Sequence, residues 1–165
     1  MQAGKQSKPA AAAKKRPEAA RSKAGTGTKQ PSKEQYNQIL AGLELTQIIV
    51  ETESLERDID QSPKGTSVHI QKNNEAQVVE DKRSFRIRDT LHLEGLREGS
   101  ETPLFKIDIT LVLQYRSKKP VTKTFLKQFA KTNLDLHSWP YFRELVQTAT
   151  SKMNLPPLVL PLSLK

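Results

Sequence analysis

An alternation of apolar and polar side chains over residues 105–116 constrains the fold of this chain more than any other feature. The apolar positions are Phe105, Ile107, Ile109, Leu111, Leu113 and Tyr115, and polar positions between them are Lys106, Asp108, Thr110, Gln114 and Arg116. Successive side chains of a strand point to opposite faces of a sheet, so this pattern predicts a long strand with one buried face and one solvated face.

Two earlier segments have the same period. The first covers roughly 37–51, and a β-bulge near Thr46 and Gln47 is needed to bring its two halves into phase. The apolar residues that the bulge aligns are Leu43, Leu45, Ile48 and Val50. The second segment is short: it contains Val68 and Ile70 and ends at a turn predicted over 72–75.

A further strand is predicted from the apolar series Phe85, Ile87, Leu91 and Leu93. Asp89 falls on the apolar side of this strand. It is either a buried carboxylate with a perturbed pKa or, as we expect, a side chain that a local twist brings to solvent or to an arginine. A short link over 98–103 leads to the strand at 105–116, and short links between consecutive strands favour an antiparallel meander.

Beyond Pro120 the period lengthens to that of helices. Phe125, Leu126 and Phe129 predict a short helix that ends near Asn133, followed by a break over 135–138. A second helix is then expected to begin with Pro140 in its first turn. Its apolar face contains Trp139, Phe142, Val146, Ala149 and Met153, with Leu145 beside them.

The second helix is predicted to end at Asn154, a residue that tolerates the left-handed conformation, before the pair Pro156 and Pro157. The predicted fold class is therefore α+β: a four-stranded antiparallel sheet followed by two C-terminal helices packed on one face.

The first 33 residues hold nine Lys and Arg residues against the single acid Glu18, which leaves +1 of the total charge of +9 for residues 34–165. This stretch has no large apolar residue after Met1, so it cannot bury enough surface to offset the entropy of ordering. We predict a disordered basic tail over 1–33 and a folded domain over 34–165. Nucleic-acid or ribosome binding is expected only through the tail.

No residue pattern predicts catalysis, a metal or a cofactor. Cysteine is absent, which excludes thiolate nucleophiles and Cys-based metal sites and suits a reducing compartment. His69, His92 and His137 are far apart, and none has a second metal ligand at the usual spacing. The motifs of serine hydrolases, dinucleotide-binding folds and zinc proteases are missing. We expect a binding protein and not an enzyme.

The sequence also predicts where the protein works. No apolar run approaches the ~20 residues that span a bilayer, and no apolar segment of a signal peptide follows the basic N-terminal residues. We expect a cytoplasmic protein without membrane insertion. The solvated sheet face would present Arg86, Arg88, Lys106 and Arg116, with the nearest aromatic, Tyr115, on the opposite face. Without interleaved aromatics, this face is interpreted as a charged solvated surface and not as a base-stacking platform.

The segment Trp139 to Leu164 is the most informative for function. Its last part, residues 155–164, is very apolar and contains prolines that exclude helix and central strand. Such a segment must lie extended against its own fold or across a partner. It is either a strap packed on the sheet or one wall of an apolar binding groove.

This segment resembles the SecB family of protein-export chaperones. Residues 139–144, Trp-Pro-Tyr-Phe-Arg-Glu, are similar to the family's pattern at the start of its long helix, and residues 155–161, Leu-Pro-Pro-Leu-Val-Leu-Pro, to its proline-punctuated extended segment. The spacing and the order of four strands and two helices agree over roughly 36–164.

The resemblance implies a homotetramer, a dimer of dimers, that holds unfolded polypeptides or preproteins in apolar grooves without ATP and transfers them to SecA. The residues that it suggests for lining the groove are Trp139, Tyr141, Phe142, Leu158 and Leu160. An ordinary place in the core is the alternative for each of them.

The chain departs from the family in its charge. Members that serve SecA are strongly acidic and use carboxylates on the exposed sheet face, whereas this domain is nearly neutral and has Arg86, Arg88 and Arg116 there. SecB-like proteins also act as dedicated chaperones of the antitoxin in a toxin–antitoxin pair. That role is the second functional hypothesis, and tail-mediated nucleic-acid or ribosome binding is the third.

Overall fold

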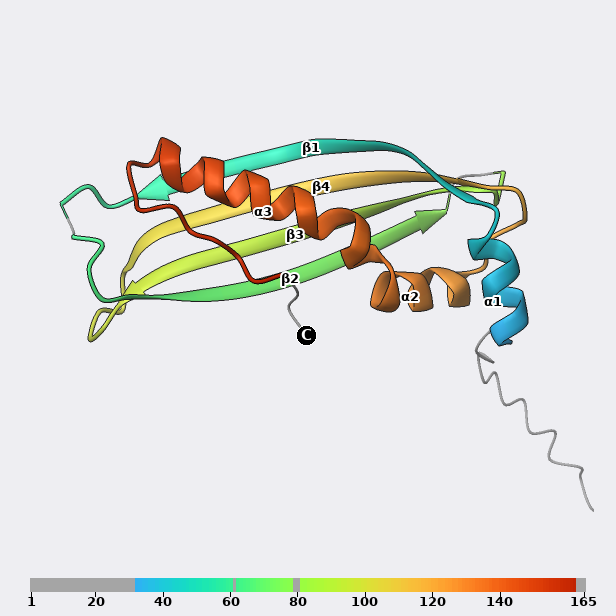
Figure 1. Ribbon diagram of the computed structural model, residues 1–165, viewed down its shortest axis with the longest axis horizontal. Helices are drawn as coiled ribbons and strands as arrows, with labels where there is room; N and C mark the ends of the chain where they lie inside the picture. The colour runs from blue at the N-terminus through green and yellow to red at the C-terminus, as the bar shows by residue number, and fades with distance from the viewer. Residues whose placement is uncertain (1–31, 61, 79–80, 163–165) are drawn as a thin grey trace, which may run out of the picture.

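The computed structural model describes residues 32–60, 62–78 and 81–162. The strands form one four-stranded sheet, which Figure 1 shows to be long and to have helices on one face. In chain order the elements are α1 (Lys33–Leu40), β1 (Leu43–Arg57), β2 (Thr66–Val78), β3 (Ser84–Arg97), β4 (Pro103–Ser117), α2 (Lys123–Thr132) and α3 (Leu134–Lys152). The predicted α+β class is confirmed. The predicted tail over 1–33 lies outside the described residues except for Ser32 and Lys33, which cap and begin α1.

The strand order is β1-β4-β3-β2, and every neighbouring pair is antiparallel. Strands β2, β3 and β4 form the predicted meander, but β1 pairs with β4 and not with β2, so the predicted meander is wrong for β1. The four strands form a Greek key. The apolar β4 is buried on its helix-covered face and occupies a central place, while the more polar β1 and β2 form the two edges.

The predicted bulge in the first strand is confirmed. The register of β1 shifts between Leu45 and Gln47, and the Thr46 hydroxyl there donates to the Gln114 carbonyl at 3.0 Å. A second shift lies between Val50 and Thr52. The strand starts at Leu43 and not near 37, because the preceding residues form α1, which begins where the Ser32 hydroxyl accepts the backbone N–H of Gln35.

The turn predicted over 72–75 is wrong. Strand β2 continues to Val78 in unbroken register with β3, and the chain reverses only before Ser84. Asp81 supports this reversal, since its carboxylate accepts the backbone N–H groups of Arg83 and Ser84 at 2.9 and 2.8 Å. The polar residues at 72–75 stay in the strand because the ladder with β3 satisfies their backbone groups. The side chains of 73–75 remain in water at the sheet edge, and Lys72 pairs with the buried Asp89.

The core lies between the sheet and the two C-terminal helices (Figure 1). The predicted short helix is confirmed as α2, and it contributes Phe125 and Phe129 to an aromatic cluster with Phe85 and Tyr115. Helix α1 packs on α2 through Tyr36, whose ring lies 5.1 Å from that of Phe125 and whose hydroxyl donates to the Asn133 side chain at 2.6 Å.

Helix α3 begins at Leu134, so the predicted break over 135–138 and the predicted place of Pro140 in the first turn are both wrong. Tertiary contacts hold the turn before Pro140 in helical form: Leu134 is fully buried, Ser138 donates to its carbonyl at 3.3 Å, and Asp135 bonds to Lys72 of β2. The predicted apolar face of the helix is confirmed, and Asn154 ends it in the left-handed conformation with φ of 52°. Over the described ranges, no helix is long and apolar enough to cross a membrane.

Candidate functional site

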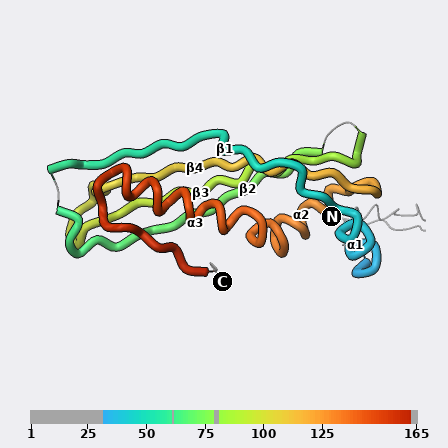
Figure 2. Tube along the Cα trace, turned by 45° about the horizontal axis from the view of Figure 1, so that its top comes forward, coloured from blue at the N-terminus to red at the C-terminus, as the bar shows by residue number. Residues whose placement is uncertain are grey.

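Residues 155–162 form an extended strap that doubles back alongside α3 (Figure 2). Two side chains of α3 fix its backbone: the indole N–H of Trp139 donates to the Pro161 carbonyl at 2.8 Å, and Nε of Arg143 donates to the Leu160 carbonyl at 3.2 Å. Leu155 and Leu160 are buried in the core. The strap is therefore packed on its own fold, as one of the two sequence interpretations expected.

The five predicted groove residues fall into two groups. Trp139, Phe142 and Leu160 are buried in the chain's own core, with exposed fractions of 4%, 0% and 2%. Tyr141 is 46% exposed and Leu158 is partly buried. The structure brings Trp139 beside both Phe142 and the strap, whereas Tyr141 is accessible from solvent.

A small apolar hollow lies between the strap and the start of β2. Its volume is about 180 Å³. It is smaller than the roughly 300–1,000 Å³ of small-molecule sites, so it suits a single apolar side chain and not a cofactor. The residues around it are Pro63, Thr66, Val68, Leu104, Phe105, Thr150, Leu155, Pro156, Pro157 and Leu158.

A second apolar surface lies on β1, and we call Leu45, Ile48 and Val50 the β1 strip. The register places them opposite Tyr115, Leu113 and Leu111 of β4, so they belong to the face that the helices cover. Leu45 is nevertheless 37% exposed and Val50 46% exposed.

The β1 strip stays accessible because α3 crosses the sheet diagonally (Figure 1). The helix reaches β1 only near the end of that strand, where Lys152 pairs with Glu53 at 2.9 Å and Arg57 donates to the Met153 carbonyl. Sequence reasoning missed the strip as a site. The available signal was the bulge, which aligns three large apolar residues on one face of an edge strand.

The strip adjoins backbone groups that have no strand partner. Strand β1 pairs with β4 along one side only, so its outer side is an open sheet edge within the described residues. An open edge can accept an extended peptide as an additional strand. Two bulges interrupt β1, a device that makes uncontrolled edge pairing less favourable.

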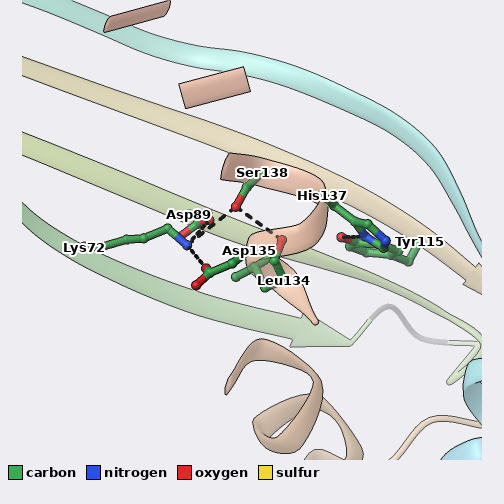
Figure 3. A network of polar contacts seen from close by, with 7 residues as sticks. All are labelled: Lys72, Asp89, Tyr115, Leu134, Asp135, His137 and Ser138. Atoms are coloured by element: carbon green, nitrogen blue, oxygen red, sulfur yellow. Dashed lines mark hydrogen bonds and ion pairs between the residues drawn. The ribbon is translucent and has the colours of Figure 1, made fainter. Parts of the chain in front are cut away.

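A charged network joins the sheet to the first turn of α3 (Figure 3). The ammonium group of Lys72 lies 2.8 Å from the Asp89 carboxylate and also contacts Asp135 and Ser138. Asp89 is fully buried, and burial raises its pKa despite the opposing effect of Lys72. The expected route of Asp89 to solvent or to an arginine is therefore wrong, and the alternative of a buried, perturbed carboxylate is confirmed.

A second contact lies further along the same turn of α3. The Tyr115 hydroxyl and Nδ1 of His137 are 2.9 Å apart (Figure 3). Burial lowers the pKa of His137 and raises the pKa of Tyr115. Both groups are thus held in their neutral forms, as expected for a structural hydrogen bond in a core.

The opposite face of the sheet is charged and open. Arg88 forms a bidentate pair with Glu51 at 2.6 and 2.7 Å. His92 lies between Asp108 at 2.5 Å and Glu94 at 3.2 Å, and the hydrogen bond to Asp108 is the main cause of its raised pKa. In the part of the chain that the structure describes, no group of three or more His, Cys, Asp or Glu side chains has an arrangement that could hold a metal ion.

Comparison with known proteins identifies the fold. The sequence matches no protein-family model and no curated protein. Its structure is similar to the SecB-like chaperone Rv1957 of Mycobacterium tuberculosis, solved in complex with a ChAD peptide from the antitoxin HigA1, with a TM-score of 0.70 and 18% identity over 78% of this chain and 96% of that chain. A protein of unknown function from Streptococcus agalactiae gives a TM-score of only 0.42, at 13% identity over 72% and 96% of the two chains. The chain therefore has the fold of a SecB-like chaperone.

Proposed function

We propose that this protein is an ATP-independent holdase chaperone, and not an enzyme, that binds non-native polypeptides in the cytoplasm as a homotetramer. The observation that carries the proposal is the β1 strip, an exposed apolar surface beside an open strand edge on a SecB-like fold. An unfolded client offers scattered apolar side chains and unpaired backbone groups. The strip would take the side chains and the edge would take the backbone.

The expected affinity of one such contact is modest. Full burial of a Leu or Val side chain contributes about 1.5–3 kcal/mol, and Leu45 and Val50 are already more than half buried. Each would add about 1 kcal/mol when covered. Tight binding therefore requires several contacts along an extended client, which fits a protein that recognises unfolded chains with little sequence preference.

A dedicated role for one antitoxin is the second candidate. It is favoured by the similar mycobacterial chaperone, which was solved with an antitoxin peptide. It is also favoured by the exposed arginines Arg86, Arg88 and Arg116 on the open sheet face, where the acidic surface of SecA-dependent relatives is expected. Transfer of preproteins to SecA is the corresponding proposal for a general export chaperone, and direct measurement of SecA binding separates the two.

The holdase proposal is tested by light scattering of an aggregating, chemically denatured protein in the absence of nucleotide. Stoichiometric amounts of the full chain should suppress the scattering. A panel of unrelated clients distinguishes the two candidates: a general holdase protects most of them, and a dedicated one protects only an antitoxin encoded nearby. Aggregation that is unchanged for every client, the antitoxin included, would refute both.

A further inference from the structure

Helices α1 and α2 lie at one end of the sheet (Figure 1), and positive residues belong to the elements that meet at this end. We define the basic end as six exposed residues: Arg83, Arg116, Lys118, Lys123, Lys127 and Lys131. Within the described ranges, none of them lies within ion-pairing distance of a carboxylate. Among the other described cations, Lys72, Arg88, Lys106 and Lys152 have acidic partners, whereas Lys64, Arg86 and Arg97 form no ion pair.

The basic end contains a large hollow of about 630 Å³. Arg83, Arg116 and Lys118 line it, together with the acids Asp81 and Glu44. The Asp81 carboxylate is already engaged by the backbone N–H groups of Arg83 and Ser84, and these bonds lower its pKa. The hollow is therefore lined by three cations against two carboxylates, and the charge of Arg116 also contributes to the lowered pKa of Asp81.

Helix α2 adds a regular row of charge. Lys123, Lys127 and Lys131 follow one another at intervals of four residues, so they share one side of the helix, and all three are exposed. The helix contains no acidic residue to offset them. Like charges four residues apart destabilise a helix, and no acidic side chain within α2 offsets the repulsion among these lysines.

The charge of the chain is thus strongly polarised. Residues 34–165 carry a net charge of only +1, yet unpaired cations collect at one end of the fold. The sequence before Ser32, with eight basic residues against Glu18, joins the fold at α1 and so at this same end.

We propose that the basic end binds nucleic acid through its phosphate groups. Of the aromatic residues at this end, Phe85, Tyr115, Phe125 and Phe129 are buried in the core. The partly buried Tyr36 packs its ring against Phe125 and bonds its hydroxyl to Asn133, so it is already engaged within the fold. Arginine and lysine contacts to phosphate carry affinity without reading sequence. The site shares no residue with the β1 strip, and it extends the expectation of tail-mediated binding to the folded domain itself.

The test uses the full chain and a short, labelled single-stranded RNA, with fluorescence anisotropy measured over a range of KCl concentrations. One triple variant, Arg83→Gln with Arg116→Gln and Lys118→Gln, changes the hollow. A second, Lys123→Gln with Lys127→Gln and Lys131→Gln, changes α2. The matched control, Lys64→Gln with Arg97→Gln and Lys106→Gln, removes the same charge from the opposite end.

Each basic-end variant should weaken RNA binding about tenfold or more at low salt, and its slope of log affinity against log salt should fall by about 2 for three lost phosphate contacts. The control should bind like the unmodified chain. Wild-type affinity in both basic-end variants would overturn the proposal, as would an equal loss in the control. Anionic vesicles of phosphatidylserine and phosphatidylcholine provide a further arm: loss of vesicle binding with RNA binding unchanged would assign the surface to membranes instead.

Discussion

The carboxylate of Asp89 lies 2.8 Å from the ammonium group of Lys72 on the neighbouring strand, on the apolar face of the sheet. Asp89 is completely buried, and Lys72 is nearly so. Through Asp135 and Ser138 the same ammonium group also contacts the first turn of α3. The pair therefore holds α3 against the sheet, and α3 provides both core residues and the hydrogen bonds to the strap.

Replacing only the cation of this pair should be costly. Lys72→Met would leave Asp89 buried without a counter-charge, which we expect to lower the free energy of unfolding by about 3–5 kcal/mol. The folded-state pKa of Asp89 is already raised above 3.8, so the folded state loses stability relative to the unfolded state as the pH rises from 3.8 through that raised value. The loss of unfolding free energy caused by Lys72→Met should therefore become smaller as the pH is lowered toward 3.8. Urea unfolding of the double variant with Asp89→Leu provides the control, because it should regain much of the loss. A neutral single variant would contradict the role of the pair.

The two partly buried histidines should give pH dependences of opposite sign. The raised pKa of His92 makes its contribution to stability full below pH 6.5 and lost as the pH rises through the raised value. The lowered pKa of His137 makes its contribution full above pH 6.5 and lost as the pH falls toward the lowered value. In thermal unfolding, the melting temperature of His92→Gln should fall less than that of the wild type as the pH rises above 6.5. The melting temperature of His137→Gln should fall less than that of the wild type as the pH drops below 6.5. Identical pH profiles for the two variants would be inconsistent with these environments.

Gly95 of β3 should not tolerate a side chain. A Cβ atom at this position would lie 2.1 Å from the Phe105 ring, which crosses over the glycine from β4. Gly95→Ala should therefore destabilise the fold by about 1–3 kcal/mol through overpacking. Gly42→Ala is the matched control, since its Cβ would lie 3.1 Å from Cβ of Lys118, a contact that a shift of a few tenths of an ångström relieves. Equal effects of the two substitutions in denaturant unfolding would argue against this packing.

The strap should open when its anchor on α3 is removed. Trp139→Phe keeps an aromatic ring but removes the donor to the Pro161 carbonyl, a bond that contributes about 1 kcal/mol. Hydrogen exchange or limited proteolysis over 155–162 should become faster. Tyr141→Phe, on an exposed residue of the same helix, should leave the strap protected. Unchanged protection in Trp139→Phe would mean that apolar packing alone holds the strap.

Features that depend on local sequence could be predicted. The alternation of β4, the bulge near Thr46, the helix α2 and the left-handed end at Asn154 are each encoded within a few residues. Most of the errors involve partners far away in the sequence, whereas the missed helix α1 has a local signal in its Ser32 cap. Pairing of β1 with β4 depends on which strand occupies the centre, and the polar residues of β2 remain extended because β3 pairs with them.

For the candidate site too, local features could be predicted and features that depend on distant residues could not. The sequence identified an apolar helix and strap, but three of the five residues that it suggested fill the chain's own core. Exposure of the β1 strip depends on the diagonal path of α3, and burial of Asp89 depends on Lys72 from another strand. No local pattern contains either relationship.

The most direct test of the account compares the two faces of β1. Leu45→Thr with Val50→Thr makes the two most exposed positions of the β1 strip polar and places β-branched residues, which suit a strand, at both. Ile49→Thr is the control: this residue is 36% exposed on the same strand but pairs with Val112 on the open face. Suppression of client aggregation should fall severalfold in the double variant and stay at the wild-type level in the control, as each lost apolar contact weakens binding by about 1 kcal/mol. Equal suppression by both variants would contradict the claim that this strip holds the client.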